Sequence, residues 1–114
     1  MIVLPQIGSI ERLERGVRLQ LQLPAELTYF EGHFPDCALL PGVVQVGWAI
    51  ELGRTHVPFA GTFRALSGVK FTRVIMPDTS PWLTLEYASE KRHLTFAYQV
   101  DDYQCSSGTI LFDV

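Results

Sequence analysis

The sequence lacks the features that mark several large classes of protein. Its 114 residues include nine Lys or Arg and twelve Asp or Glu, giving a formal charge of −3, and the basic residues form no stripe. A nucleic-acid partner is therefore not expected. No apolar run approaches the ~20 residues of a membrane span. Residues 1–10 also lack the basic start and apolar core of a secretion signal.

Cysteine is scarce as well. Cys37 and Cys105 are the only two, too few for a disulfide framework, and no Cys/His cluster has metal-ligand spacing. We therefore expect a reduced, cytoplasmic protein without metal or cofactor. With 47% hydrophobic and 18% charged residues, residues 1–114 suit one globular domain. Pairing with a second chain would help so small a domain to bury apolar surface.

Apolar and polar residues alternate in several segments, which predicts half-buried strands. Such segments are residues 12–23, 82–87 and 93–100, and residues 103–114 are expected to form the last strand. Residues 27–31 are predicted to be a short extended piece. Residues 63–74 predict a strand with an imperfect period and a bulge near Gly68. Its expected buried positions are Leu66, Val69, Phe71 and Val74.

One segment predicts a helix. Pro41 suits a helix start, Val43 to Leu52 are almost all apolar, and Gly53 is a plausible C-cap. A helix that is apolar on most sides is usually buried. One buried helix with an antiparallel sheet of about five or six strands gives an α+β architecture.

The most informative stretch is Gly32-His33-Phe34-Pro35, followed by Leu40-Pro41-Gly42-Val43-Val44-Gln45. Imidazole titrates near neutral pH and can act as a general base. The first N–H groups of a helix are unpaired and can stabilise negative charge. This spacing can direct both groups toward one small volume, which suits the chemistry of an acyl thioester.

Together with the later element Val69 to Asp78, this stretch resembles the hotdog-fold 3-hydroxyacyl-[acyl-carrier-protein] dehydratases, the FabA/FabZ-like family. The segment from Leu39 to Ala49 is similar to dehydratase-like proteins of polyene lipid gene clusters. The resemblance covers nearly the whole chain. It implies a hotdog domain that forms a homodimer, or a heterodimer with a related hotdog chain, with two sites at the subunit boundary.

The resemblance also implies roles for single residues. His33 would be the base that removes the proton alpha to the carbonyl, and the Gly42 N–H would hold the enolate oxygen. The substrate would be an acyl thioester of carrier protein or coenzyme A. Its acyl chain would enter a tunnel beside the helix, with substrate contacts expected from Phe34, Val43, Gly47 and Trp48. Core packing is the alternative role for Trp48.

The acid of the reaction is missing from its usual place. The resembling enzymes carry Asp or Glu fourteen positions after the histidine, and Gly47 occupies that position here. Glu51 lies one turn further along the same helix face, displaced by ~6 Å. It is the candidate substitute, or else an ordinary exposed carboxylate. Asp36 and Glu31 flank the histidine turn and are further candidates.

Two other groups of residues have alternative interpretations. Cys37 lies four residues from His33 and could form a nucleophile–base pair with it, or be a small buried cysteine. Lys70, Arg73 and Arg54 could form a basic patch that docks an acidic carrier protein, or be solvated charges.

Three functions remain open. We favour a dehydratase-like enzyme of fatty-acid or polyene lipid synthesis, with activity reduced or altered by Gly47. The second is a non-catalytic acyl-thioester-binding module or heterodimer partner subunit. The third is an acyl thioesterase, which needs a well-placed carboxylate or Cys37 to activate water. The fold alone does not choose among them.

Overall fold

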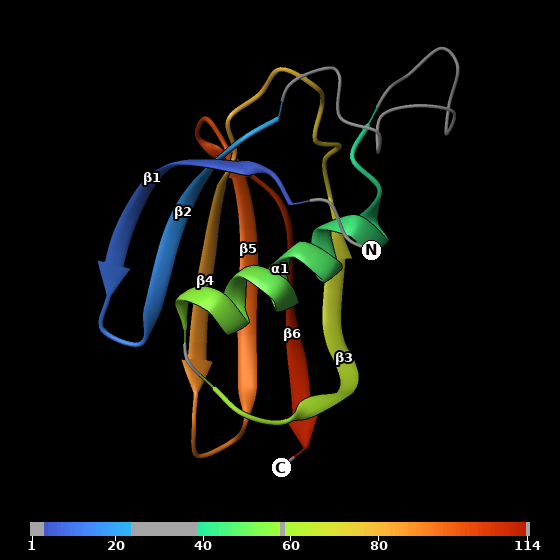
Figure 1. Cartoon of the computed structure of the whole chain (residues 1–114). Coiled ribbons are helices and arrows are strands. Elements are labelled where there is room, and N and C mark those ends of the chain that lie inside the picture. The colour runs from blue at the N-terminus through green and yellow to red at the C-terminus, as the bar shows by residue number, and fades with distance from the viewer. Residues whose placement is uncertain (1–3, 24–38, 58, 114) are drawn as a thin grey trace.

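The computed structural model describes residues 4–23, 39–57 and 59–113. Six strands form one sheet in the order β1-β2-β4-β5-β6-β3, and every neighbouring pair is antiparallel. The helix α1 lies across one face of this curved sheet (Figure 1). The elements are β1 Gln6–Leu13, β2 Gly16–Gln22, α1 Gly42–His56, β3 Thr62–Phe71, β4 Trp82–Ala88, β5 His93–Val100 and β6 Tyr103–Asp113.

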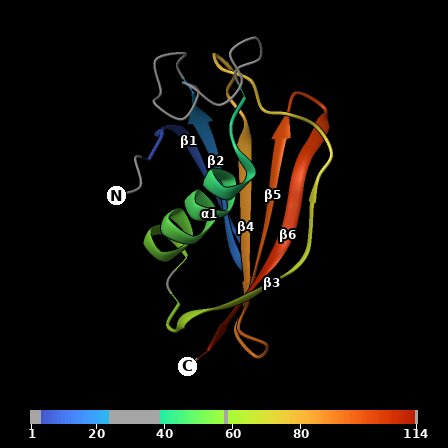
Figure 2. The ribbon, with the colours of Figure 1, turned by 90° about the vertical axis from the view of Figure 1, so that its right-hand side faces the viewer.

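The predicted α+β class is confirmed, and the described residues form one helix and six antiparallel strands. Alternating residues of β2, β4 and β5 point toward the helix and are buried: Val17, Leu19, Leu21, Leu83, Leu85, Leu94, Phe96 and Tyr98. The helix buries Trp48, Ala49 and Leu52 in the same core. Its other side is not covered by the sheet (Figure 2), and Val43 there is 80% exposed.

The helix is longer than the sequence suggested. It begins at Gly42, directly after Pro41, as expected, but it continues to His56 and is capped by Val57. The predicted C-cap at Gly53 is therefore wrong. A Cβ at Gly53 would lie 2.9 Å from a methyl carbon of Leu94. This glycine therefore allows close packing of the helix on β5.

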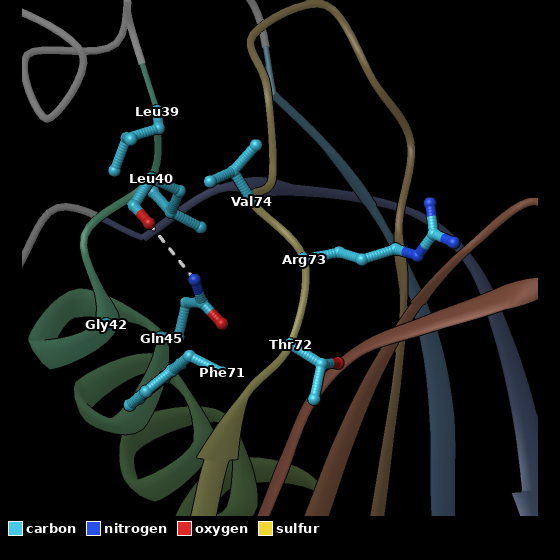
Figure 3. Close-up of a pocket in the computed structure, with 8 residues that line it drawn as sticks. All are labelled: Leu39, Leu40, Gly42, Gln45, Phe71, Thr72, Arg73 and Val74. Carbon is cyan, nitrogen blue, oxygen red and sulfur yellow. Dashed lines mark hydrogen bonds between the residues drawn. The ribbon is translucent and has the colours of Figure 1, made fainter.

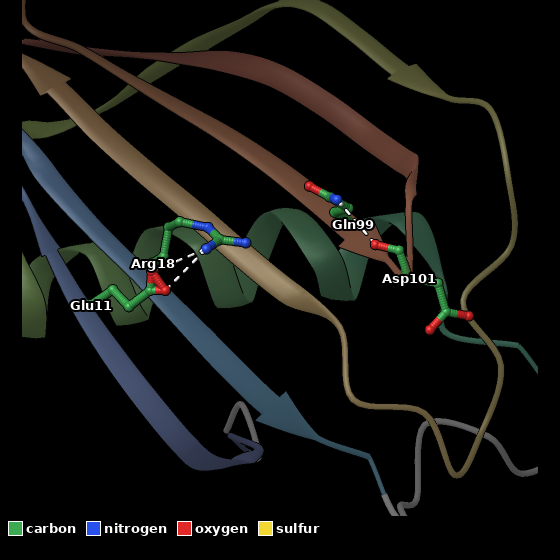
Figure 4. Close-up of polar contacts among 4 residues, drawn as sticks. All are labelled: Glu11, Arg18, Gln99 and Asp101. Atoms are coloured by element: carbon green, nitrogen blue, oxygen red, sulfur yellow. Dashed lines mark hydrogen bonds and ion pairs between the residues drawn. The ribbon is translucent and has the colours of Figure 1, made fainter.

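The first strand was not predicted. β1 is largely exposed and lies at the sheet edge, so it shows little apolar alternation. It pairs with β2, where Arg18 donates to both carboxylate oxygens of Glu11 at 3.1 and 3.0 Å (Figure 4). In the turn between β5 and β6, Gln99 Nε2 donates to the carbonyl oxygen of Asp101. Both contacts are exposed and lie outside the core.

The third strand corrects another expectation. Its bulge near Gly68 is confirmed, since the register shifts between Ser67 and Lys70 and Gly68 has φ +61°. Its expected buried residues are not buried: Leu66, Phe71 and Val74 are exposed, and Val69 is half-buried. The reason is that β3 is an edge strand, and its apolar residues line an open groove beside the start of α1.

The remaining strands agree closely with the sequence patterns. β4, β5 and β6 begin at the predicted residues, and tight turns join them. The extended piece predicted for residues 27–31 lies outside the described residues. Within the described ranges, no helix has the length and apolar character needed to cross a membrane.

Candidate active site

The N-terminus of α1 is the part of the fold with the clearest chemical potential. Pro41 is extended, with φ −62° and ψ 146°, and its carbonyl accepts hydrogen bonds from the N–H groups of Val44 and Gln45, each at 3.1 Å. Gly42 and Val43 precede these donors, so their N–H groups have no partner within the helix. No side chain caps this end in the described part of the chain, and its first turn holds no acidic residue.

A cavity of about 320 Å³ opens beside this helix end. It lies between the start of α1 and the segment that follows β3, as Figure 3 shows. The lining residues are Leu39, Leu40, Gly42, Gln45, Phe71, Thr72, Arg73 and Val74. Mostly apolar walls beside the positive end of a helix suit a ligand that combines a hydrocarbon part with a carbonyl.

A second hollow, of about 210 Å³, lies between α1 and β3 and is lined by Gly42, Val43, Val46, Leu66, Val69 and Phe71. None of these residues has a polar side chain. Gly42 and Phe71 line both spaces. The helix end therefore lies where a more polar cavity meets an apolar groove, an arrangement suited to an acyl chain attached to a carbonyl.

The two sequence elements that carried the family resemblance meet at this point. Gly42 comes from the first element, and Phe71 to Val74 come from the second. A Cβ on Gly42 would lie 2.8 Å from Cζ of Phe71, so only a glycine allows the ring to pack this closely. The 28 residues between Gly42 and Phe71 therefore form a helix and an edge strand that return the chain to the same cavity.

Several predicted site residues cannot be placed in this geometry. His33, Phe34, Cys37, Asp36 and Glu31 lie outside the described residues. Their roles remain predictions.

The remaining predicted substrate-contact and acid residues all lie on α1, and they differ in burial and in distance from the cavity. Gly47 is half-buried in the middle of α1, and Trp48 is fully buried in the core. Val43 lines the apolar groove. Glu51 is exposed and lies nine residues from Gly42, ~13 Å along the axis. Among the described residues, neither cavity is lined by a carboxylate.

The three basic residues do not form one patch. Arg73 lines the cavity, and its guanidinium lies 4.3 Å from the ring centre of Tyr103. Lys70 is exposed near the end of β3. Arg54 lies near the opposite end of α1, where it donates to the Gly61 carbonyl at 3.0 Å. The expectation that Arg54 belongs with the other two is therefore corrected.

Burial raises the pKa of two groups near the helix. Burial raises the pKa of Tyr98 well above 10.0, and its neutral hydroxyl donates to the Gln45 carbonyl at 2.7 Å. Burial also raises the pKa of the Cys105 thiol, which is free. A buried, protonated thiol is a poor nucleophile. Neither group is a catalytic candidate.

Sequence reasoning missed one residue at the cavity. Gln45 is buried, and its side chain bonds to both the helix start and the sheet. The signal was present, because Gln45 is the polar exception in the apolar run Val43 to Trp48.

Comparison with known sequences and structures gives consistent results. Residues 9–109 match the sequence family described as ApeI-like, ApeI dehydratase. A chain of the dehydratase heterocomplex ApeI:P from Xenorhabdus doucetiae has a similar structure, with a TM-score of 0.89 and 31% identity, covering 96% of this chain and 98% of that one. An uncharacterized protein from Erwinia carotovora subsp. atroseptica matches with a TM-score of 0.80 and 31% identity, covering 95% and 92%.

Curated relatives point in the same direction. The 3-hydroxyacyl-[acyl-carrier-protein] dehydratase FabZ of Thermomicrobium roseum is 28% identical, over 97% of this chain and 80% of the relative. The FabZ of Chloroflexus aggregans is 30% identical over 94 residues, 75% of this chain. The match spans 64% of that relative's length. These comparisons support the hotdog fold that the sequence motifs implied.

Proposed function

The chain belongs to the ApeI-like dehydratase family, and we propose that it dehydrates 3-hydroxyacyl thioesters of an acyl carrier protein to enoyl thioesters. The membership confirms the resemblance seen in the sequence. The observation that carries the proposal is the N-terminus of α1, which no described side chain caps and which lies beside both a cavity and an apolar groove. Relatives named 3-hydroxyacyl-[acyl-carrier-protein] dehydratase support the choice of substrate.

The reaction removes one α-proton and the β-hydroxyl, and it releases one water. We assign the removal of the α-proton to His33. The electron pair left on the α-carbon moves to the thioester oxygen, to which the Gly42 N–H donates a hydrogen bond. Loss of one such donor typically costs ~3 kcal/mol of barrier. The electron pair then forms the carbon–carbon double bond as the hydroxyl leaves with a proton.

Gly47 decides where that proton comes from. A glycine has no side-chain donor, so the acid found fourteen positions after the histidine in similar enzymes is absent here. The imidazolium of His33 holds the proton taken from the α-carbon and can return it to the leaving hydroxyl. Glu51 is the alternative donor. Because general acids contribute ~10²- to 10⁴-fold, we expect slower turnover than in an enzyme with a dedicated carboxyl.

We further propose that the active form is a dimer that pairs through β3. This strand is an edge of the sheet, and it exposes Phe63, Leu66 and Phe71 beside the uncovered side of α1. An unpaired edge with exposed apolar side chains is typical of a protein interface. One similar structure is a heterocomplex. Either a second copy or a related hotdog chain therefore fits as the partner.

Gly47 favours a second candidate function. A chain without the acid could be the non-catalytic subunit of a heterodimer, binding acyl thioesters or stabilising an active partner. A thioesterase is less well supported, because no described residue that lines the cavity is a carboxylate. Lys70 and Arg73, near the cavity, suit an acidic carrier protein. A cytoplasmic location stays a prediction.

One experiment tests the main proposal. The purified protein is incubated with a 3-hydroxyacyl carrier protein, and the enoyl product and free thiol are followed by mass spectrometry. We expect enoyl product from the wild type and at least a 100-fold loss in His33→Ala, with unchanged circular dichroism. A coenzyme A thioester of the same acyl group tests the carrier preference.

Other outcomes would contradict the proposal. Enoyl formation that survives in His33→Ala removes that residue from the mechanism. Free thiol without enoyl product indicates a thioesterase. Absence of both products, from the chain alone and from the chain mixed with a related hotdog subunit, excludes the dehydratase.

A further inference from the structure

Gln45 is the polar residue on the buried face of α1. Only 3% of its surface is exposed, and the residues beside it on that face, Trp48 and Ala49, belong to the apolar core. Burial of an amide is unfavourable unless its polar atoms are hydrogen-bonded. A methionine would fill a similar volume without that requirement. The amide at this position therefore needs a physical reason.

Both polar atoms of the Gln45 side chain have partners inside the protein. Nε2 donates to the Leu40 carbonyl at 3.0 Å, the contact drawn as a dashed line in Figure 3. Oε1 accepts from the hydroxyl of Ser106, on β6, at 2.7 Å. The backbone carbonyl of Gln45 accepts from Tyr98, on β5. The first turn of α1 is thus tied to two central strands.

The bond from Gln45 to the Leu40 carbonyl is the one that bears on the helix start. Leu40 is held on both sides of its backbone, since its N–H donates to the Ile75 carbonyl at 2.8 Å and its carbonyl accepts from Gln45. The next residue, Pro41, has a ring that fixes φ. The N–H of Gly42 shares a peptide plane with the Pro41 carbonyl. The orientation of the Leu40–Pro41 peptide therefore acts on that plane together with ψ of Pro41, which is 146°.

We propose that Gln45 and Ser106 are a positioning pair that aims the Gly42 N–H at the cavity. The pair acts through the Leu40 carbonyl and not by contact with substrate. Ser106 is 1% exposed and does not line either cavity described above. Its hydroxyl donates to Gln45, and we assign its effect on catalysis to that bond, although its backbone also pairs with Phe71 across the two strands. The catalytic consequence rests on the dehydratase function proposed above, whereas the geometric consequence does not.

The test compares Ser106→Ala with Ser107→Ala. Ser106 pairs with Tyr98, whose side chain faces the helix, whereas Ser107 pairs with Ala97 and faces the opposite side. The two changes remove the same atom from neighbouring residues of one strand. Only the first removes the donor to Gln45. Ser107→Ala is therefore the matched control.

Two measurements are made on these variants and on the wild type. The first is the ¹⁵N–¹H resonance of Gly42, including its solvent exchange rate. The second is kcat and KM for 3-hydroxyacyl carrier protein. In Ser106→Ala we expect a shifted, faster-exchanging Gly42 amide and a kcat lowered about 10-fold with KM little changed, a part of the 10²- to 10³-fold effect of a whole oxyanion donor. Ser107→Ala should match the wild type in both.

Gln45→Glu provides a test by pH. A neutral carboxyl can donate to the Leu40 carbonyl and accept from Ser106, whereas a carboxylate has no donor. Burial raises the pKa of a carboxyl. Relative to the wild type at the same pH, the kcat of this variant should fall reversibly as pH rises through that raised pKa. Circular dichroism at each pH checks that the protein stays folded.

The outcomes separate this inference from the proposed function. If the wild type forms no enoyl product but the Gly42 amide responds to Ser106→Ala alone, the function is wrong and the positioning pair stands. If the wild type is active and the two serine variants agree in both the Gly42 resonance and kcat, the positioning pair is wrong. A Gly42 amide that responds equally to both serine variants also overturns it.

Discussion

The ring of Phe71 packs directly over Gly42, so that an added Cβ would lie 2.8 Å from its Cζ atom. One residue begins α1 and the other ends β3. Their contact connects the first turn of the helix to the segment that closes the cavity. Substitution of either residue should therefore affect both the cavity and the helix start.

Gly42→Ala should lower both stability and activity. The new methyl group must displace the Phe71 ring, and overpacking of this kind costs about 1–3 kcal/mol. Helix propensity alone would favour alanine by about 1 kcal/mol. In a Phe71→Ala background, where the clash is absent, the same change should be neutral or stabilising. Urea unfolding of the four proteins measures this, and equal costs of Gly42→Ala in both backgrounds would contradict the contact.

Leu66→Asp should weaken the dimer. Leu66 is 43% exposed on β3, the edge strand proposed to pair with the partner. An unpaired charge buried in an interface typically costs several kcal/mol, so the dissociation constant should rise roughly 100-fold or more. Sedimentation velocity measures the effect.

Ile10→Asp is the matched control for this prediction. Ile10 is also an exposed aliphatic residue, but it lies on β1, the opposite edge of the sheet. This variant should associate like the wild type. If Ile10→Asp dissociates the dimer and Leu66→Asp does not, the interface lies at β1.

The sequence pattern best predicts strands that have one buried face and one solvent-exposed face. β4 and β5 each alternate between core and solvent, and their starts at Trp82 and His93 were predicted correctly. β1 was missed because an exposed edge strand has no buried face to produce a pattern. Leu66 and Phe71 were wrongly expected to be buried, because an apolar residue in a sequence does not reveal whether its own chain covers it.

The candidate site was predictable only in part. The Pro41–Gly42 helix start followed from the chemistry of proline and glycine, and the structure places it at a cavity. The contact between Phe71 and Gly42 depends on a reversal of chain direction that local sequence patterns do not encode. The same is true of the bond from Ser106 to Gln45, whose residues are 61 positions apart.

Tyr98→Phe should lower stability and change its dependence on pH. The variant loses the hydrogen bond to the Gln45 carbonyl, which is worth about 1 kcal/mol. Burial raises the pKa of Tyr98 well above 10.0 in the folded state. The unfolded state therefore releases its proton first as pH rises above about 10, and stability falls there. Chemical denaturation from pH 8 to 11 should show a smaller loss in Tyr98→Phe than in the wild type. Parallel pH curves would contradict the assignment.

Glu51→Gln should leave dehydration almost unchanged. Glu51 is exposed, and the cavity beside Gly42 is lined by other residues. The backbone of Glu51 lies ~13 Å along the helix axis from Gly42, the proposed oxyanion donor. We therefore expect kcat within twofold of the wild type, with the proton returned by His33. The pH profile of kcat should then be the same in both proteins, because removal of a carboxyl that takes no part in proton transfer leaves the ionising groups of the reaction unchanged. A loss of 100-fold or more, with stability unchanged, would instead identify Glu51 as the acid and would imply that the substrate or the partner chain brings the reaction to the middle of α1.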